Sequence, residues 1–148
     1  IEATGLNVPE VHPEKFRPLY LALYEAISQG LIASCHAVSR GGLAVHLALV
    51  AMAGDVGMEV DIGGVAGAED LTPAQALYSE SCGRFIITAA PEKAHRLEEV
   101  FSGCEIGRVG VVTQKPDFII KDQDDKRIID VVQNRLKAEW KRPFGGLV

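Results

Sequence analysis

The sequence lacks the features that would place it in a membrane or on nucleic acid. No uninterrupted apolar run approaches the roughly 20 residues that a membrane-spanning helix needs. No basic segment followed by an apolar run opens the chain, as a secretion signal would. The chain has 15 basic and 20 acidic residues, a formal net charge of -5 at pH 7. This balance argues against nucleic acid or an anionic membrane as a partner.

Cysteine is also scarce, and its number and spacing argue against a disulfide framework. The three cysteines are Cys35, Cys82 and Cys104, an odd number with no C-x-x-C pair. Reduced thiols in a cytoplasmic protein are therefore expected. The first residue is Ile1 and not Met, which suggests a processed chain or a piece of a longer polypeptide.

What the sequence does contain is typical of a folded domain, with 47% hydrophobic and 24% charged residues among 148. We interpret residues 1–12 as a lead-in and residues 13–148 as a single domain. Apolar spacing and turn residues predict an order of helices and strands that mixes crossovers with hairpins. That order favours an α+β fold, a mixed β-sheet flanked by helices. The expected helices are 13–27, 42–53, 72–77, 91–101 and one capped by Asp130; the expected strands are 31–38, 58–62, 84–90, 106–113, 118–120 and 127–129.

The first stretch that could bind a ligand is the glycine turn Ser39-Arg40-Gly41-Gly42. It lies between an apolar strand and an apolar helix. Free N–H groups at a helix start, together with the helix dipole, favour an anion such as phosphate. Glycine lets a ligand approach the backbone, and Arg40 adds a cation. The alternative is a plain strand-to-helix turn with Ser39 as the N-cap. Spacing alone favours this second interpretation, since short glycine turns are common.

The second stretch is "LYSESCGRF", which places Ser79, Glu80, Ser81 and Arg84 around a glycine just before a strand. Glu80 could accept a hydrogen bond or join a metal site, and Ser81 could donate to a ligand. The alternative is a polar turn in which Glu80 and Arg84 pair with each other or with solvent. The residues alone leave both interpretations open.

The sequence gives weaker support for other kinds of site. Cys35 and His36 are adjacent, so a strand would point them to opposite faces, and the cysteines lack zinc-ligand spacing. His46 lies in an apolar helix and is interpreted as a core histidine. A Ser-His-Asp triad stays open, although no G-x-S-x-G elbow is present. The acidic "DQDD" at 122–125 is interpreted as a solvated hairpin tip, because its spacing does not continue into a calcium loop.

Two long stretches resemble a known family. "SCHAVSRGGLAVHLALVAMAGDVGMEVDI" and "LYSESCGRFIITAAPEKAHRLEEVF" followed by "IGRVG" are similar to the C-terminal domain of the aminoimidazole ribonucleotide synthetase superfamily. Within it they look most like the phosphoribosylformylglycinamidine synthase family of purine biosynthesis. The resemblance runs from about Val8 to Thr113, and the tail after Phe118 matches less distinctively. It implies a three-layer α/β/α arrangement.

The resemblance also implies a function for a longer protein. Enzymes of this family are C–N ligases that use ATP and Mg²⁺, and take ammonia from a glutaminase subunit or domain. Their catalytic elements lie largely in other domains, so it implies no catalytic residue here and an inactive isolated domain. The matching turn and the Ser79-Glu80-Ser81 stretch would face an auxiliary nucleotide site. The expected partners are the remaining domains of the synthase and the glutaminase, with self-association of the isolated domain into a homo-oligomer through the surface left exposed.

The chain departs from the family pattern at two positions. The family usually reads His-Asp-x-Ser-Asp/Glu-Gly-Gly-Leu, whereas Ala37 and Arg40 replace the two acids here. Losing two carboxylates removes metal or hydrogen-bond partners, and Arg40 reverses the local field. We therefore expect no metal at this site, with either an anion held directly or a purely structural turn. The substitutions keep a second hypothesis open, a stand-alone binding or regulatory module; selenophosphate or thiamine-phosphate synthesis fits less well.

Overall fold

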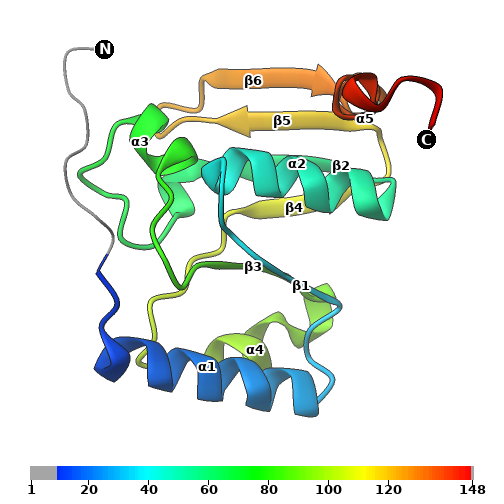
Figure 1. Ribbon diagram of the computed structural model, residues 1–148. Helices are drawn as coiled ribbons and strands as arrows, with labels where there is room; N and C mark the ends of the chain where they lie inside the picture. The colour runs from blue at the N-terminus through cyan, green and yellow to red at the C-terminus, as the bar shows by residue number, and fades with distance from the viewer. Residues whose placement is uncertain (1–9, 148) are drawn as a thin grey trace. The chain divides into compact units, whose positions relative to one another are not determined.

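The computed structural model describes residues 10–147 and divides the chain into two compact units. Unit 1 comprises residues 1–40 and 80–104, and unit 2 comprises residues 41–79 and 105–148. The chain therefore passes from one unit to the other at three places (Figure 1). The first two of these places are the two stretches that the sequence singled out.

Unit 1 is a two-stranded sheet packed against two helices. It contains α1 (Pro13–Ser28), β1 (Ser34–Ala37), β3 (Phe85–Thr88), the 3-10 turn η2 (Pro91–Lys93) and α4 (Ala94–Val100). Strands β1 and β3 are antiparallel, with Ser34 opposite Thr88 and Ala37 opposite Phe85. The core of the unit is formed by Ala22, Leu23, Ala26, Leu31, Leu97 and Phe101.

Local signals explain where α1 begins and ends. Pro13 occupies the first turn, where its missing N–H costs nothing, and Glu14 is placed favourably near the positive end of the helix. The chain leaves the helix at Gly30, whose φ of 65° is easy for glycine. The small side chains of Ala22 and Ala26 are buried and let the helix approach the rest of unit 1 closely.

Unit 2 is built around a four-stranded mixed sheet in the order β4-β2-β5-β6. Strands β2 and β5 are parallel, and the two outer pairs are antiparallel. The elements of unit 2 are α2 (Gly42–Gly54), β2 (Gly57–Asp61), η1 (Ile62–Gly64), α3 (Pro73–Tyr78), β4 (Gly110–Thr113), β5 (Asp117–Lys121), β6 (Arg127–Val132), α5 (Gln133–Lys141) and η3 (Arg142–Leu147).

The core of unit 2 lies between α2 and the two central strands. Leu47 and Ala51 of α2 are fully buried, and so are Val60 of β2 and Phe118 and Ile120 of β5. Exposure alternates along β2, as in a half-buried strand, because Glu59 and Asp61 are exposed on its other face.

The α+β class with a mixed sheet is confirmed, as are most of the predicted elements. Some details differ. The apolar run that contains β1 predicts a buried strand, but Ser34, Cys35 and Ala37 are exposed. The strand expected from residue 106 begins only at Gly110, since the preceding residues belong to no regular element.

The last helix also differs, because Asp130 does not cap it. Asp130 lies inside β6, opposite Ile119, and its carboxylate pairs with Arg127 at 2.8 Å. The helix begins at Gln133, whose backbone N–H donates to Pro116 O at 2.7 Å. The side chain of Gln133 donates to Asp55 Oδ1 at 3.3 Å. Sheet pairing and these tertiary contacts therefore outweigh the local cap that Asp130 offered.

The single-domain interpretation of residues 13–148 stays a prediction, and most of the expected lead-in lies outside the described residues. Among the helices of the described part, none combines the length and apolar character that crossing a bilayer would take.

Candidate functional site: the glycine turn and the serine-rich turn

The glycine turn before α2 has a backbone that only glycine adopts easily. Gly41 is the N-cap of α2 with a φ of 90°, and Gly42 follows with a φ of 69°. A Cβ on Gly42 would lie 2.6 Å from Leu77 O, and one on Gly41 would lie 2.8 Å from Val45 Cγ2. Left-handed backbone and close contacts therefore both require glycine here.

Ser39 is not the N-cap residue of α2. The N-cap position belongs to Gly41. Ser39 and Arg40 are exposed residues between the end of β1 and the helix. The alternative interpretation of Ser39 as an N-cap is therefore wrong. A glycine N-cap has no side-chain oxygen of its own, unlike the usual Ser, Thr, Asp or Asn.

The serine-rich turn runs from the end of α3 to the start of β3. Ser79 is the C-cap of α3, and its N–H donates to Gln75 O at 3.0 Å. Glu80 and Ser81 are exposed, whereas Arg84 is half-buried. Burial lowers the pKa of the Arg84 guanidinium, because a cation removed from water is less stable. A half-buried arginine at this point is a suitable counter-charge for an anion.

Each unit holds the two turns next to each other. In unit 1, the N–H of Val38 at the end of β1 donates to Arg84 O at 2.9 Å. In unit 2, Gly42 at the start of α2 lies against the backbone of Leu77 and Tyr78 at the end of α3. The two turns, about forty residues apart in the sequence, are thus linked by one contact within unit 1 and by one contact within unit 2.

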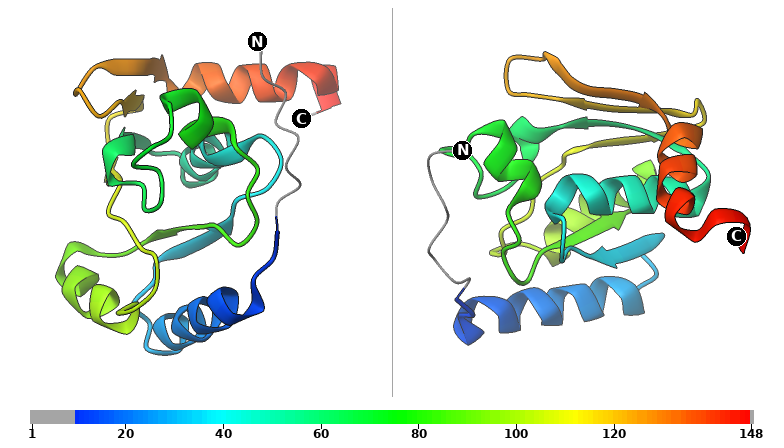
Figure 2. Two further views of the ribbon diagram at one scale, coloured as in Figure 1. Left: turned by 90° about the vertical axis from the view of Figure 1, so that its left-hand side faces the viewer. Right: turned by 45° about the horizontal axis from the view of Figure 1, so that its top comes forward.

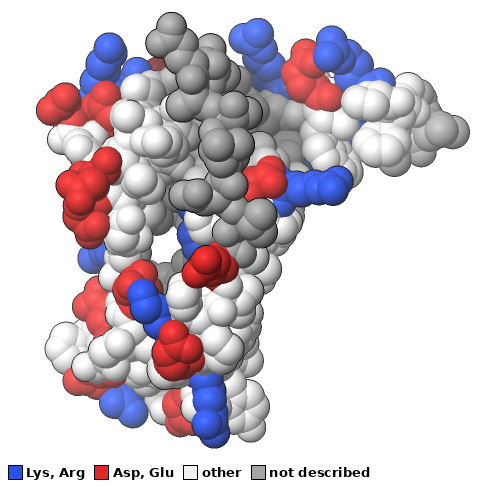
Figure 3. Space-filling model, turned by 60° about the vertical axis from the view of Figure 1, so that its left-hand side comes forward, with Lys and Arg blue, Asp and Glu red and all other residues white. Residues whose placement is uncertain are grey.

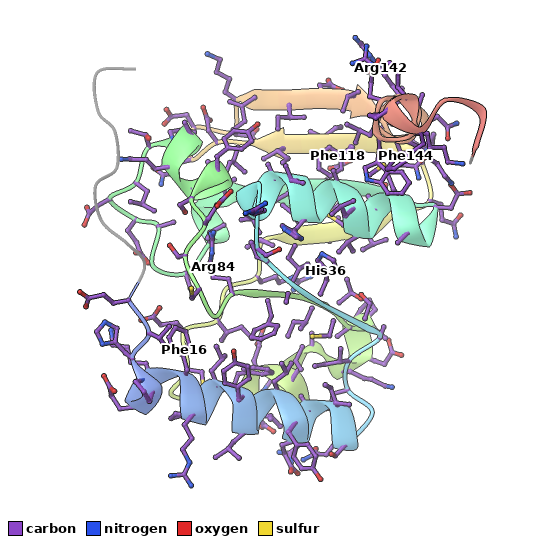
Figure 4. All side chains as sticks on the ribbon, in the orientation of Figure 1. Phe16, His36, Arg84, Phe118, Arg142 and Phe144 are labelled. Atoms are coloured by element: carbon purple, nitrogen blue, oxygen red, sulfur yellow. The ribbon has the colours of Figure 1, made fainter. Side chains whose placement is uncertain are left out.

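The aromatic ring of Phe16 supports the serine-rich turn, a role that the sequence pattern does not indicate. Gly83 has a φ of 77°, and a Cβ there would lie 1.8 Å from Cε1 of Phe16. Phe16 comes from the first turns of α1 (Figure 4). Its place in the apolar stripe of that helix marks it as a packing residue, but only the fold shows what it packs against.

The side chains considered for other chemistry are separated. Within residues 10–147, no three His, Cys, Asp or Glu side chains gather as metal ligands would. His46 is 6% exposed in α2, which agrees with its interpretation as a core histidine. Although Cys35 is an exposed residue, partial desolvation raises the pKa of its thiol, which lowers its reactivity at neutral pH. The "DQDD" stretch forms the β5–β6 hairpin tip, where Asp122 Oδ1 accepts from the N–H groups of Asp124 and Lys126.

The molecular face drawn in Figure 3 carries acidic and basic side chains interspersed with uncharged ones. Charges of both signs alternate there, so this face does not form a single-sign patch of the kind that follows a nucleic acid backbone.

A family model covers most of the chain. Residues 1–123 match the model described as AIR synthase related protein, C-terminal domain. The chain belongs to this family. Both turns of the candidate site fall inside the matched residues, whereas all of β6 and α5 lies beyond them.

Curated relatives include subunits of phosphoribosylformylglycinamidine synthase. The chain is 32% identical over 137 residues to the phosphoribosylformylglycinamidine synthase subunit PurL of Thermococcus sibiricus, which covers 90% of this chain and 19% of the relative. It is 39% identical over 107 residues to PurL of Thermococcus gammatolerans, covering 72% of this chain and 15% of that protein. The chain therefore spans less than a fifth of the length of these two relatives.

Solved structures share the fold. Thermotoga maritima PurL complexed with FGAR superposes with a TM-score of 0.79 at 24% identity, covering 92% of this chain and 23% of that one. The hydrogenase maturation protein HypE superposes with a TM-score of 0.65 at 17% identity, covering 77% of this chain and 41% of HypE. At these identities the likeness concerns the fold.

Proposed function

We propose that this chain is the C-terminal domain of a PurL-type phosphoribosylformylglycinamidine synthase and contributes an auxiliary phosphate or nucleotide site to it. In this proposal the catalytic centre lies in other domains. The observation that carries the proposal is the glycine start of α2, with its two left-handed glycines, the second of which packs against the end of α3. This geometry supports a phosphate site because backbone N–H groups and the helix dipole favour an anion at a helix start.

The residues of the proposed site fall into two segments. Ser39, Arg40, Gly41 and Gly42 form the first, and Ser79, Glu80, Ser81 and Arg84 form the second. The glycines give the phosphate access to the backbone, and the arginines balance its charge. The hydroxyls of the serines, and a Glu80 carboxylate accepting from a ribose hydroxyl, would orient a nucleotide.

The departures from the family pattern support a site that holds its anion without a metal. Ala37 ends β1 as an exposed residue, and Arg40 is exposed in the turn. A metal-bridged phosphate needs carboxylates, whereas an arginine contacts phosphate directly through its planar guanidinium. In the proposal Arg40 therefore takes the place of the metal and its acidic ligands.

For the whole enzyme the proposal includes ATP and Mg²⁺ as cofactors. Solved neighbours include T. maritima PurL complexed with ATP and with ADP. The proposed partners are the other domains of the synthase and a glutaminase that supplies ammonia. A further solved structure with this fold is that of PurLQS from T. maritima. A ligase of this pathway would work in the cytoplasm, where its substrates are found.

Isothermal titration calorimetry with ADP tests the site on the 148-residue chain, with and without Mg²⁺. We expect binding that does not need Mg²⁺ and that weakens about tenfold in Arg40→Ala, since one charge-assisted contact is lost. Arg108→Ala is the matched control, because Arg108 is an exposed arginine outside both turns. Tight binding that requires Mg²⁺ would refute the metal-free site, and equal binding by Arg40→Ala would remove Arg40 from it.

The ligase assignment is tested on the polypeptide that carries this sequence in cells. An immunoblot of cell extract gives its native mass, and an assay of glutamine-dependent amidine formation gives its activity. A multidomain protein with this activity supports the proposal, and an intact multidomain protein without it refutes the ligase assignment. The loss of both family acids at Ala37 and Arg40 favours a second candidate function, that of a free-standing binding module. In that case the immunoblot band would have the size of this chain.

A further inference from the structure

Two aromatic rings of α1 contact the residues on either side of Arg84. Helix α1 lies against the sheet of β1 and β3 in unit 1 (Figures 1 and 2). The ring of Phe16 fills the space that a side chain on Gly83 would need, because a Cβ there would lie 1.8 Å from its Cε1 atom. The ring of Tyr20 meets the ring of Phe85 edge-on, with 5.6 Å between the centroids. Phe16 and Tyr20 are four residues apart and therefore share one face of the helix.

The backbone around Arg84 is fixed within unit 1 as well. The carbonyl oxygen of Arg84 accepts from the N–H of Val38 at 2.9 Å, and the strand β3 that follows pairs with β1. The residue before it, Gly83, has a left-handed φ of 77°, which glycine adopts easily. Strand β1 therefore secures the chain after Arg84, and the ring of Phe16 secures the turn before it.

The side chain of Arg84 is partly enclosed by its surroundings. It is half-buried, and its Nε atom is shielded from water. A guanidinium that is already held in place loses less conformational entropy on binding an anion than one that moves freely in solvent. Its planar group contacts phosphate oxygens in a fixed geometry. The position of Arg84 should therefore affect how tightly an anion binds.

We propose that Phe16 is a positioning residue for Arg84 in the anion site and acts through Gly83. This inference rests on the proposed function, which places Arg84 at a phosphate or nucleotide. With the ring in place, Gly83 keeps the backbone conformation from which the guanidinium reaches the anion. Without the ring, the turn before Arg84 loses its support and the guanidinium moves among several positions. Phe16 does not contact the anion in this arrangement.

Isothermal titration calorimetry of the 148-residue chain with ADP tests the inference. We expect Arg84→Ala to weaken binding about tenfold, because a charge-assisted contact is lost. Phe16→Ala should weaken binding roughly twofold to tenfold, which corresponds to the cost of immobilising one long side chain. In the Arg84→Ala background, Phe16→Ala should have no further effect on affinity, because the residue through which it acts is absent.

Two variants separate this role from a general loss of stability. Leu19→Ala is the matched control, because Leu19 lies on the same helix, is also half-buried and packs against the core of unit 1. It should destabilise unit 1 without changing the affinity for ADP. Phe16→Leu keeps an apolar side chain against the turn and should retain most of the parent affinity. Circular dichroism checks that every variant is folded.

A measurement on the ligand-free chain tests the same contact. The hydrogen on Nε of Arg84 should exchange slowly with water in the parent chain, because that nitrogen is shielded. Its NMR signal is identified by its absence in Arg84→Lys. The exchange should become faster in Phe16→Ala and stay slow in Leu19→Ala. A ring that only stabilised unit 1 would affect the two variants alike.

The outcomes separate this inference from the proposed function. A parent chain that binds no ADP would refute the proposed function, and binding that is unaffected by Arg84→Ala would remove Arg84 from the site; either result also ends the role of Phe16. If the parent binds and Arg84→Ala weakens binding, the proposed function stands, and four results would overturn the inference alone. They are an unchanged affinity in Phe16→Ala, a full loss in the Arg84→Ala background, an equal loss in Leu19→Ala, and an unchanged exchange rate at Arg84 in Phe16→Ala.

Discussion

Replacing Gly83 by alanine should destabilise unit 1 through two separable effects. The left-handed φ of 77° is unfavourable for alanine by roughly 1–2 kcal/mol. The added Cβ would lie 1.8 Å from Phe16 Cε1 and 2.4 Å from Cδ1. Forcing a packed ring to move typically costs about 1–3 kcal/mol. The free energy of unfolding of Gly83→Ala should therefore fall by roughly 2–5 kcal/mol.

Gly103 provides the matched control for the backbone effect alone. It also belongs to unit 1, its φ is 86°, and a Cβ there would have nothing within 4 Å. Gly103→Ala should therefore cost only about 1–2 kcal/mol. Both substitutions restrict the unfolded chain equally, so this contribution cancels in the difference between them.

Urea unfolding followed by far-UV circular dichroism measures both free energies, with a further test in a Phe16→Ala background. Once the ring is removed, the cost of Gly83→Ala should drop to that of Gly103→Ala. If Gly83→Ala costs no more than Gly103→Ala in the parent chain, the contact between Phe16 and the serine-rich turn does not exist as described. The same conclusion follows if removing the ring leaves the cost unchanged.

Three further predictions concern unit 2. Gly42→Ala should lower the free energy of unfolding of this unit by roughly 2–5 kcal/mol, because it combines a φ of 69° with a backbone clash; fluorescence of the chain's single tryptophan reports it. Thr72→Ala should cost about 1 kcal/mol in urea unfolding, since it removes the capping box with Gln75, whereas Thr72→Ser should cost little. The hydrogen bond and charge of Lys121 lower the pKa of Asp125. The stability that this ion pair contributes is therefore fully present above about pH 4, and it is lost as the pH falls through the pKa of Asp125 in the folded protein. Lys121→Met should return the Asp125 pKa toward 3.8 in an NMR titration, and an unchanged pKa would contradict this.

Much of the fold could be predicted because its signals are local. The capping box at Thr72 depends on residues three apart, and Pro13 and Gly30 mark both ends of α1 in the sequence. The hairpin of β5 and β6 is indicated by two apolar runs around a polar turn. The glycine start of α2 could be located for the same reason, since Gly41 and Gly42 adopt a backbone that few other residues tolerate.

The candidate site was only partly predictable. Its two segments can be recognised from their residue types and from the resemblance to a family. Their proximity depends on Val38 meeting Arg84 and on Gly42 meeting Leu77, which are pairs far apart in the sequence. The support that Phe16 gives to Gly83 depends on the packing of α1, and a helical stripe alone does not indicate its partner.

By itself, the sequence determined the kinds of element, most of their order and the glycine positions, because backbone preferences and caps act over a few residues. Only the tertiary structure decided that β2 pairs in parallel with β5, that β6 continues through Asp130, and that α5 begins at Gln133. These outcomes depend on hydrogen bonds and burial between residues such as Gln133 and Asp55, 78 positions apart. A local pattern cannot encode such contacts, because the free energy that selects them exists only when the distant partner is in place.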